Sequence, residues 1–218
     1  MTASDVPRET FVEPEPPSTD IVLGAHADAI RQFAAALIEQ GELRGLIGPR
    51  ELERIWSRHL LNSAVIAPLL QTGATVADVG SGAGLPGLVL AMLRPDCGFV
   101  LIEPMQRRSD WLSEQARALG LENVQVEQAR GQDSAYRGRM DAVTARAVSA
   151  LRTLLPIVSP LAKPGGELLL MKGAAVYDEL AAAQSQVRAA GLSHVEVLQL
   201  RPAADLEATR VFRARVGR

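Results

Sequence analysis

VADVGSGAGLPGLVLA, at residues 76–91, is the stretch that decides the fold of this chain. A short apolar strand ends at Asp78, a turn rich in glycine follows, and the apolar run from Pro86 is typical of a helix. Glycine residues in such a turn permit positive φ and let backbone N–H groups approach a ligand closely. The start of the helix behind them favours an anionic group, such as a carboxylate. The stretch therefore predicts a pocket for a nucleotide-like ligand.

One interpretation of the turn is a dinucleotide-binding loop. Gly82, Gly84 and Gly87 satisfy the G-x-G-x-x-G pattern, and Glu103 follows roughly 20 residues later, as such a fold requires. That pattern alone is weak, and Pro86 takes the place where the loop should pass into the helix. A tight turn without any ligand is a further alternative. The ordered succession of strand, glycine turn, helix, strand and acid disfavours it.

The other interpretation is a loop that binds a methyl donor. Asp78-x-Gly80-x-Gly82-x-Gly84 places an acid directly before the glycines and resembles motif I of class I S-adenosylmethionine-dependent methyltransferases. Glu103, at the end of FVLIE, matches the second-strand acid of that class. A carboxylate there can accept both ribose hydroxyls, and the loop has no lysine for a phosphate. We therefore expect S-adenosylmethionine as the cofactor.

Beyond this loop the chain alternates apolar strands with helical segments, as a parallel sheet requires. Two final strands without a helix between them indicate an antiparallel hairpin. Met105, Leu112, Ala116 and Leu119 are expected to form an inward stripe on one helix, and Pro164-Gly165-Gly166 a turn. The expected strands are 76–79, 98–103, 123–129, 140–146, 167–172, 194–200 and 209–216, and the expected helices are 86–93, 106–119, 150–162 and 176–190.

The expected fold is α/β, of the Rossmann-like class I methyltransferase type: a mostly parallel seven-stranded sheet with helices on both faces. Residues 1–20, rich in proline and glutamate, are predicted to be a disordered tail. Residues 21–72 are predicted to be a helical extension, and residues 73–218 the methyltransferase domain. Within the extension we expect an amphipathic helix over 21–40, a loop, and one or two helices whose inward stripe is Leu52, Ile55, Trp56, His59, Leu60 and Ser63.

Composition bounds the class of protein. The chain has 218 residues, of which 47% are hydrophobic and 22% charged, and its net charge is −2, which is typical of a globular domain with a full core. A single cysteine, scattered histidines and no run of ~20 apolar residues lead us to expect a cytoplasmic protein without a disulfide, a metal site or a membrane span. Arginines crowd the C-terminus, so a basic rim on an acidic body is expected.

Four motifs in order resemble one narrower family. They are Leu85-Pro86-Gly87, SRHLLNSAVIAPLL at 57–70, MDAVTARAVSAL at 140–151 and LLLMKG at 168–173. At compatible spacing these are similar to the bacterial 16S ribosomal RNA guanine-N7 methyltransferases, the glucose-inhibited division protein B family. The resemblance spans about residues 22–218. The chain departs from the family pattern in GELRGLIGPRE at 41–51, in Asn62 for an aspartate, and in Arg130-Gly131-Gln132-Asp133 for Arg-x-Glu-Glu.

The resemblance implies methylation of a guanine N7, at nucleotide 527 in the 530 loop of 16S ribosomal RNA, with the RNA or the assembling small subunit as partner. N7 carries a lone pair and no proton, so no general base and no catalytic acid–base residue is expected, and positioning and electrostatics supply the catalysis. The base must be extruded or already unpaired. The resemblance further implies donor contacts at Gly80, Leu85, Gly131 and Gln132, with Arg146 at the mouth between donor and substrate.

Arg146 and Lys172 end their strands at the edge where open α/β sheets place their sites, so both are candidate substrate or transition-state contacts. The alternative for Arg146 is a structural ion pair with Asp141 or Glu103, and for Lys172 a solvated strand end. Arg130 and Arg201 are weaker candidates for RNA contact. His59 is expected to be a hydrogen-bonded packing histidine, and Trp56 and Trp111 are expected in the core.

Other functions stay open at this point. The same fold can methylate a small molecule or a protein. A module that binds the donor without catalysis is a further alternative, as is a dinucleotide oxidoreductase.

Overall fold

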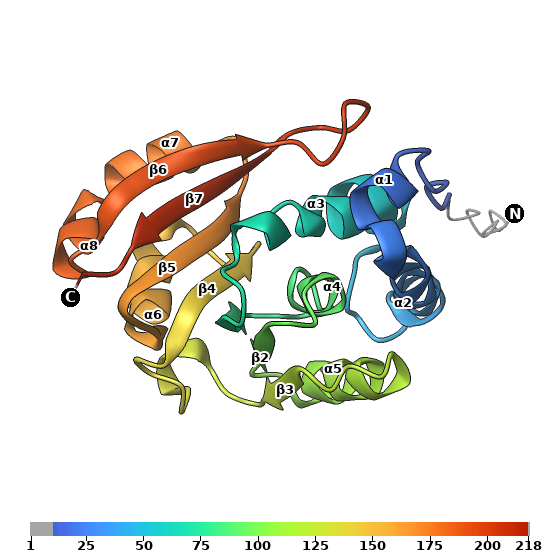
Figure 1. Ribbon diagram of the computed structural model, residues 1–218, viewed down its shortest axis with the longest axis horizontal. Coiled ribbons are helices and arrows are strands. Elements are labelled where there is room, and N and C mark those ends of the chain that lie inside the picture. Colours follow the sequence, from blue (N-terminus) through green and yellow to red (C-terminus); the bar gives the residue numbers. More distant parts are fainter. Residues whose placement is uncertain (1–10, 218) are drawn as a thin grey trace, which may run out of the picture.

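The centre of the molecule is a seven-stranded sheet with the strand order β3-β2-β1-β4-β5-β7-β6, seen in a computed structural model that describes residues 11–217 (Figure 1). The first five strands in that order are parallel, and β7 runs antiparallel to both of its neighbours. The expected sheet and its terminal hairpin are confirmed. The strands are β1 (Thr75–Val79), β2 (Gly98–Ile102), β3 (Val124–Glu127), β4 (Met140–Arg146), β5 (Ala162–Lys172), β6 (Ser193–Leu200) and β7 (Thr209–Arg215).

Helices cover both faces of the sheet because its strands carry apolar side chains on both sides. On β5, for example, Leu169 faces one core and Leu170 the other. The N-terminal helices, α4 and α5 cover the first face, and α6, α7 and α8 cover the second (Figure 1). The helices are α1 (Thr19–Leu23), α2 (Ala27–Gln40), α3 (Leu61–Ala64), α4 (Gly87–Leu93), α5 (Gln106–Ala118), α6 (Leu151–Val158), α7 (Val176–Ala182) and α8 (Gln184–Ala189).

The expected helix over 21–40 is divided into two. Gly24, with φ of 52°, ends α1, and a short 3₁₀ turn leads into α2. The whole segment Thr19–Gln40 is apolar and long enough to pass as a membrane span by composition. Its side chains Ile30, Phe33 and Leu37 are, however, fully buried in the first core, as those of a packed helix in a globular protein are.

The segment before α3 is built from less regular turns than expected. A 3₁₀ helix, η2 (Pro49–Arg54), passes directly into a π-helix, η3 (Ile55–Leu60), and then into α3. The predicted inward stripe of this segment is confirmed, because its six side chains from Leu52 to Ser63 are all buried. The π-helix η3 carries Arg58 and His59, two residues of the candidate site.

The predicted tail is wrong for residues 11–20. The backbone N–H of Glu13 donates to Leu52 O, and its carboxylate accepts hydrogen bonds from the backbone N–H groups of Trp56 and Ser57 at 2.8 and 3.0 Å. These N–H groups lie at the start of η3 and would otherwise lack a partner. The Glu13 carboxylate therefore caps this helix. Ser18 and Thr19 are buried. Residues 1–10 of the predicted tail lie outside the described residues.

Three smaller expectations are corrected. Met105 is 41% exposed instead of facing inward, because it precedes α5 with an extended backbone and does not share the helix stripe. Pro164-Gly165-Gly166 does not form a separate turn: β5 begins at Ala162 and the register with β4 shifts between Met140 and Ala142, which is a bulge. The helix expected over 176–190 breaks at Ala183, between α7 and α8.

Candidate functional site

The glycine loop joins β1 to α4 at the carboxyl edge of the sheet, as predicted. Gly80, Gly82 and Gly84 adopt φ of 72°, 55° and 98°, a region that favours glycine. The backbone N–H of Gly80 donates to Ile102 O at 2.8 Å, which ties the loop to the end of β2. The indole N–H of Trp111 donates to Ala83 O at 3.0 Å, so this tryptophan is a core residue that also supports the loop.

Asp78 lies beneath this loop and is fully buried. One carboxylate oxygen accepts from the Gly87 backbone N–H at 3.0 Å. The other, Oδ1, is buried and has no hydrogen-bond partner among residues 11–217. Burial raises the pKa of Asp78 from 3.8 to about 6, against the opposing hydrogen bond from the Gly87 backbone N–H. The hydroxyl of Ser81 donates to the backbone oxygen of Asp78 instead, at 2.8 Å. A buried acceptor without a partner fits a ligand that brings a donor, such as an ammonium group.

Glu103 closes the other side of the loop. Its carboxylate is buried and accepts from the backbone N–H groups of Gly82 and Met105, both at 3.0 Å. Each carboxylate oxygen has two lone pairs, so two acceptor positions remain for ribose hydroxyls. The residues present therefore fit S-adenosylmethionine, for which Asp78 and Glu103 would be the polar anchors.

In the turn after β3, the backbone at Gly131 packs closely against neighbouring side chains. A Cβ on Gly131 would lie 2.7 Å from Ile157 and 2.9 Å from Val79, so only glycine fits there. Gln132 and Arg130 on either side of it are exposed. The predicted contacts of Gly131 and Gln132 with the adenine, and of Leu85 with the donor, stay predictions.

Arg146 ends β4 and lies beside the glycine loop. Its guanidinium donates to Arg58 O at 3.2 Å, and its Nη2 lies 3.0 Å from Nδ1 of His59. Burial lowers the pKa of Arg146 to about 10, while the charge of Asp78 opposes that shift. The suggested ion pair with Asp141 or Glu103 is wrong: Asp141 pairs with Lys163, and Glu103 is held by backbone N–H groups.

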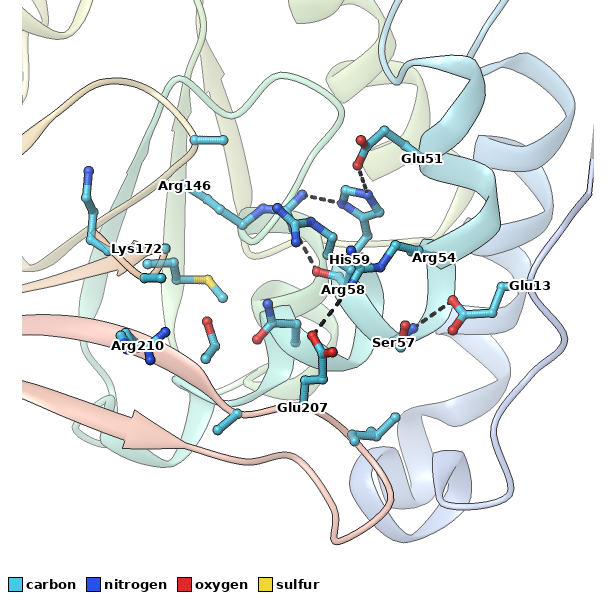
Figure 2. Close-up of a pocket in the computed structure, with 18 of the residues that line it drawn as sticks. Glu13, Glu51, Arg54, Ser57, Arg58, His59, Arg146, Lys172, Glu207 and Arg210 are labelled. Carbon is cyan, nitrogen blue, oxygen red and sulfur yellow. Dashed lines mark hydrogen bonds and ion pairs between the residues drawn. The ribbon is translucent and has the colours of Figure 1, made fainter. Parts of the chain in front are cut away.

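A cleft of about 1100 Å³ opens next to the loop, and Arg146 belongs to its wall (Figure 2). Val148 joins the two places, because it lines the cleft and a Cβ on Gly80 would lie 2.9 Å from its side chain. Several parts of the chain form the wall: the segment before α1, the run from η2 to α3, the end of β4 and the segment after it, the end of β5, α7, and the connection from β6 into β7. The lining residues include Glu51, Arg54, Arg58, His59, Asn62, Arg146, Val148, Lys172, Glu207 and Arg210.

Cationic side chains gather in this cleft, and some of them are not neutralised. Arg54 pairs with Glu207 at 3.2 Å. In the part of the chain that the structure describes, the side chains of Arg58 and Arg210 make no hydrogen bond or salt bridge, and Nε of Arg210 is buried. Arg58 is exposed and Arg210 half-buried, and a guanidinium without a carboxylate partner in a cleft favours an anionic ligand.

Two of the three candidate RNA contacts, Lys172 and Arg201, are engaged within the protein, whereas Arg130 is exposed. Lys172 is not a solvated strand end, because its buried ammonium donates to Ser149 O at 2.8 Å and pairs with Glu179 at 2.7 Å. Arg201 donates to the carbonyls of Ala204 and Leu206, which shapes the connection between β6 and β7. Lys172 thus ties the end of β5 to the segment after β4, which forms part of the cleft wall.

Two of the C-terminal arginines form salt bridges within the sheet and do not contribute free charges to the predicted basic rim. Arg213 and Arg215 both pair with Glu167, at 2.9 and 3.0 Å. Arg210 is the exception, because it lines the cleft. Sequence reasoning therefore missed Arg58, Arg210 and the contact between His59 and Arg146. The available signals were the pair Arg58-His59 inside a helical motif of the resembled family and, for Arg210, the crowding of arginines near the C-terminus.

Comparison with known proteins identifies the family. The sequence profile of the family described as rRNA small subunit methyltransferase G matches residues 26–206. The chain belongs to this family. It is 53% identical over 212 residues to the ribosomal RNA small subunit methyltransferase G of Clavibacter sepedonicus, covering 97% of this chain and 100% of that protein. It is 54% identical over 205 residues to the protein of the same name from Leifsonia xyli subsp. xyli, covering 94% and 98%.

Solved structures share the fold at low sequence identity. The tRNA (m1A58) methyltransferase TrmI of Aquifex aeolicus has a TM-score of 0.58 at 16% identity and covers 72% of this chain and 69% of its own. A SAM-dependent methyltransferase, also from Aquifex aeolicus, has a TM-score of 0.53 at 18% identity and covers 93% and 94%. The expected class I methyltransferase fold and its cofactor, S-adenosylmethionine, are thus confirmed.

Proposed function

We propose that this protein transfers a methyl group from S-adenosylmethionine to N7 of a guanine, nucleotide 527 in the 530 loop of 16S ribosomal RNA, in the cytoplasm. Family membership supports the ribosomal RNA substrate. The observation that carries the proposal is the cleft with uncompensated arginines that opens beside the glycine loop, with Arg146 where the two meet.

The charges of the cleft suit an RNA backbone better than a neutral small molecule. Phosphate groups contacted by arginine supply most of the salt-dependent affinity for nucleic acids, and they fix the register of the bound strand. Arg58 and Arg210 are placed for such contacts, on opposite walls formed by η3 and β7. Five acidic side chains line the cleft beside five cationic ones, so the attraction for RNA falls to the two arginines whose side chains have no hydrogen-bond or salt-bridge partner among the described residues, Arg58 and Arg210.

Methyl transfer to guanine N7 does not require a general acid or a general base. S-adenosylmethionine supplies an electrophilic methyl group when bound. Asp78 and Glu103 hold polar parts of the donor, and Arg146 orients the guanine or its phosphate at the mouth of the cleft. The N7 lone pair has no proton to lose, so the protein contributes position and a polar environment.

Mapping N7-methylguanine in ribosomal RNA from cells with and without this protein tests the proposal. The modification at nucleotide 527 is expected only when the protein is present, and an unchanged map refutes the assignment. Purified small subunits and naked RNA, each incubated with the protein and labelled donor, show which of the two is the substrate.

The role of the cleft has a separate test. Arg58→Ala and Arg210→Ala are each expected to weaken RNA binding and to reduce the salt slope by about one counterion. Arg188→Ala is the matched control, because Arg188 is exposed on α8, outside the cleft. Equal losses in all three variants contradict the assignment of the cleft.

A further inference from the structure

Three side chains form a continuous line of hydrogen bonds at the cleft wall (Figure 2). Oε2 of Glu51 lies 2.5 Å from Nε2 of His59, and Nδ1 of the same imidazole lies 3.0 Å from Nη2 of Arg146. Glu51 belongs to η2 and His59 to the π-helix η3, whereas Arg146 ends β4. The line therefore connects the N-terminal helices to the edge of the sheet.

The direction of each hydrogen bond follows from the chemistry of its partners. A guanidinium can only donate, so Nδ1 of His59 must accept from Arg146. The single proton of the neutral ring then lies on Nε2 and is donated to the carboxylate of Glu51. Burial, and next the charge of Arg146, lower the pKa of His59 to about 4, so the ring is neutral at physiological pH.

The hydrogen bond to His59 also orients the guanidinium of Arg146. Its guanidinium has five N–H donors, and the contacts with His59 and Arg58 O engage two of them. The carboxylate of Asp78 attracts the same guanidinium, yet Oδ1 of Asp78 has no partner among the described residues. Arg146 makes its hydrogen bonds to His59 and Arg58 O and none to Asp78. Oδ1 of the buried carboxylate and the remaining guanidinium donors are thus available to ligands.

We propose that Glu51 and His59 are positioning residues: Glu51 fixes the tautomer of His59, and His59 holds the Arg146 guanidinium toward the substrate. The proposal rests on the proposed function for its substrate. A carboxylate that orients a histidine, which in turn orients the residue that meets the ligand, is a recurring arrangement at metal and catalytic sites. Here the oriented group is an arginine.

Glu51→Leu removes the acceptor for the His59 proton at nearly constant volume. We expect the kcat for RNA methylation to fall about 10-fold or more, as losses of orienting partners do elsewhere, with the Kd for S-adenosylmethionine within about 3-fold of wild type. Glu51→Gln keeps a carbonyl oxygen for the same N–H and should restore most of the activity. Glu53→Leu is the matched control, because Glu53 is an exposed glutamate of the same η2 segment.

Nitrogen NMR of histidine-labelled protein reads the tautomer directly and needs no RNA. Wild type and Glu51→Gln are expected to carry the His59 proton on Nε2. Glu51→Leu is expected to show a mixture of tautomers, because a ring that has lost its Glu51 acceptor no longer keeps Nδ1 against Arg146. A proton on Nδ1 in wild type overturns the proposal, as does Glu51→Leu protein that methylates RNA at the wild-type rate. Because wild type and Glu51→Gln suffice for the NMR readout, a Glu51→Leu chain that fails to fold does not remove the test.

The two proposals fail in different ways. If wild-type protein does not methylate guanine N7, the proposed function is wrong, while the NMR and donor-binding results still decide the tautomer and the placement of Arg146. If wild type is active and the tautomer is random, only the positioning role is wrong.

Discussion

Replacing Asp78 by asparagine is expected to stabilise the ligand-free fold relative to wild type as the pH rises, and to weaken the binding of S-adenosylmethionine. Asp78 is fully buried, and burial raises its pKa from 3.8 to about 6. The folded state therefore holds a proton that the unfolded state has already released between these two values. Stability contributed by this proton is complete below pH 3.8 and is lost as the pH rises through about 6.

The magnitude follows from the same two values. A rise from 3.8 to about 6, at about 1.4 kcal/mol per pH unit, makes the ionised aspartate cost about 3 kcal/mol at pH 8. Asparagine has no such dependence, although its amide adds an offset that does not change with pH. We therefore expect the free energy of unfolding of Asp78→Asn, minus that of wild type, to grow by about 2.4 kcal/mol between pH 4 and pH 8, because the unfolded aspartate is already partly ionised at pH 4.

Urea unfolding of both proteins without ligand, at half-unit steps of pH, measures this difference. Other titrating groups are common to both proteins and cancel. A difference that is flat across the range refutes the reasoning, because it means that Asp78 titrates alike in the folded and unfolded states. In parallel, isothermal calorimetry should show weaker binding of S-adenosylmethionine by Asp78→Asn, since the buried anionic acceptor is gone.

Three substitutions and one control, Gly98→Ala, test the packing around the site by chemical denaturation. Gly87→Ala should lower the free energy of unfolding by about 1–3 kcal/mol, because its Cβ would lie 2.4 Å from a leucine of β2, whereas Gly98→Ala, with open space around it, should change it by less than about 0.5 kcal/mol. Lys172→Met should lower it by about 3 kcal/mol, since the Glu179 charge loses its partner. Trp111→Phe should lower it by about 1–2 kcal/mol through the lost hydrogen bond to the glycine loop. Unchanged midpoints for the first, third or fourth variant contradict the corresponding contact.

The glycine loop and its two acids were predictable because their signals are local. Asp78, the glycines and Glu103 follow one another at spacings set by a strand, a tight turn and a helix, and the structure places them together. The terminal hairpin was likewise predictable, since two strands without an intervening helix can pair only as antiparallel neighbours in so short a length.

The roles of the long polar side chains were not predictable in this way. Lys172 was expected at a solvated edge or against RNA, but Glu179, from the following helix, neutralises it. His59 and Arg146 are 87 residues apart in sequence, and their contact exists only because η3 packs against the end of β4. Which carboxylate an arginine or lysine meets depends on tertiary placement, about which the residue type says nothing.

The N-terminal helices share their apolar core with the sheet. Leu23, Ile30, Phe33 and Leu37 are buried in one continuous cluster with α4 and α5. The helical extension and the methyltransferase domain are therefore one cooperative unit, although they are separable in sequence. Exchanging these helices with those of a relative, in order to alter the substrate, succeeds only if the buried face travels with the cleft residues. If the proposed function holds, the segment that would contact the substrate cannot fold apart from the segment that would hold the donor.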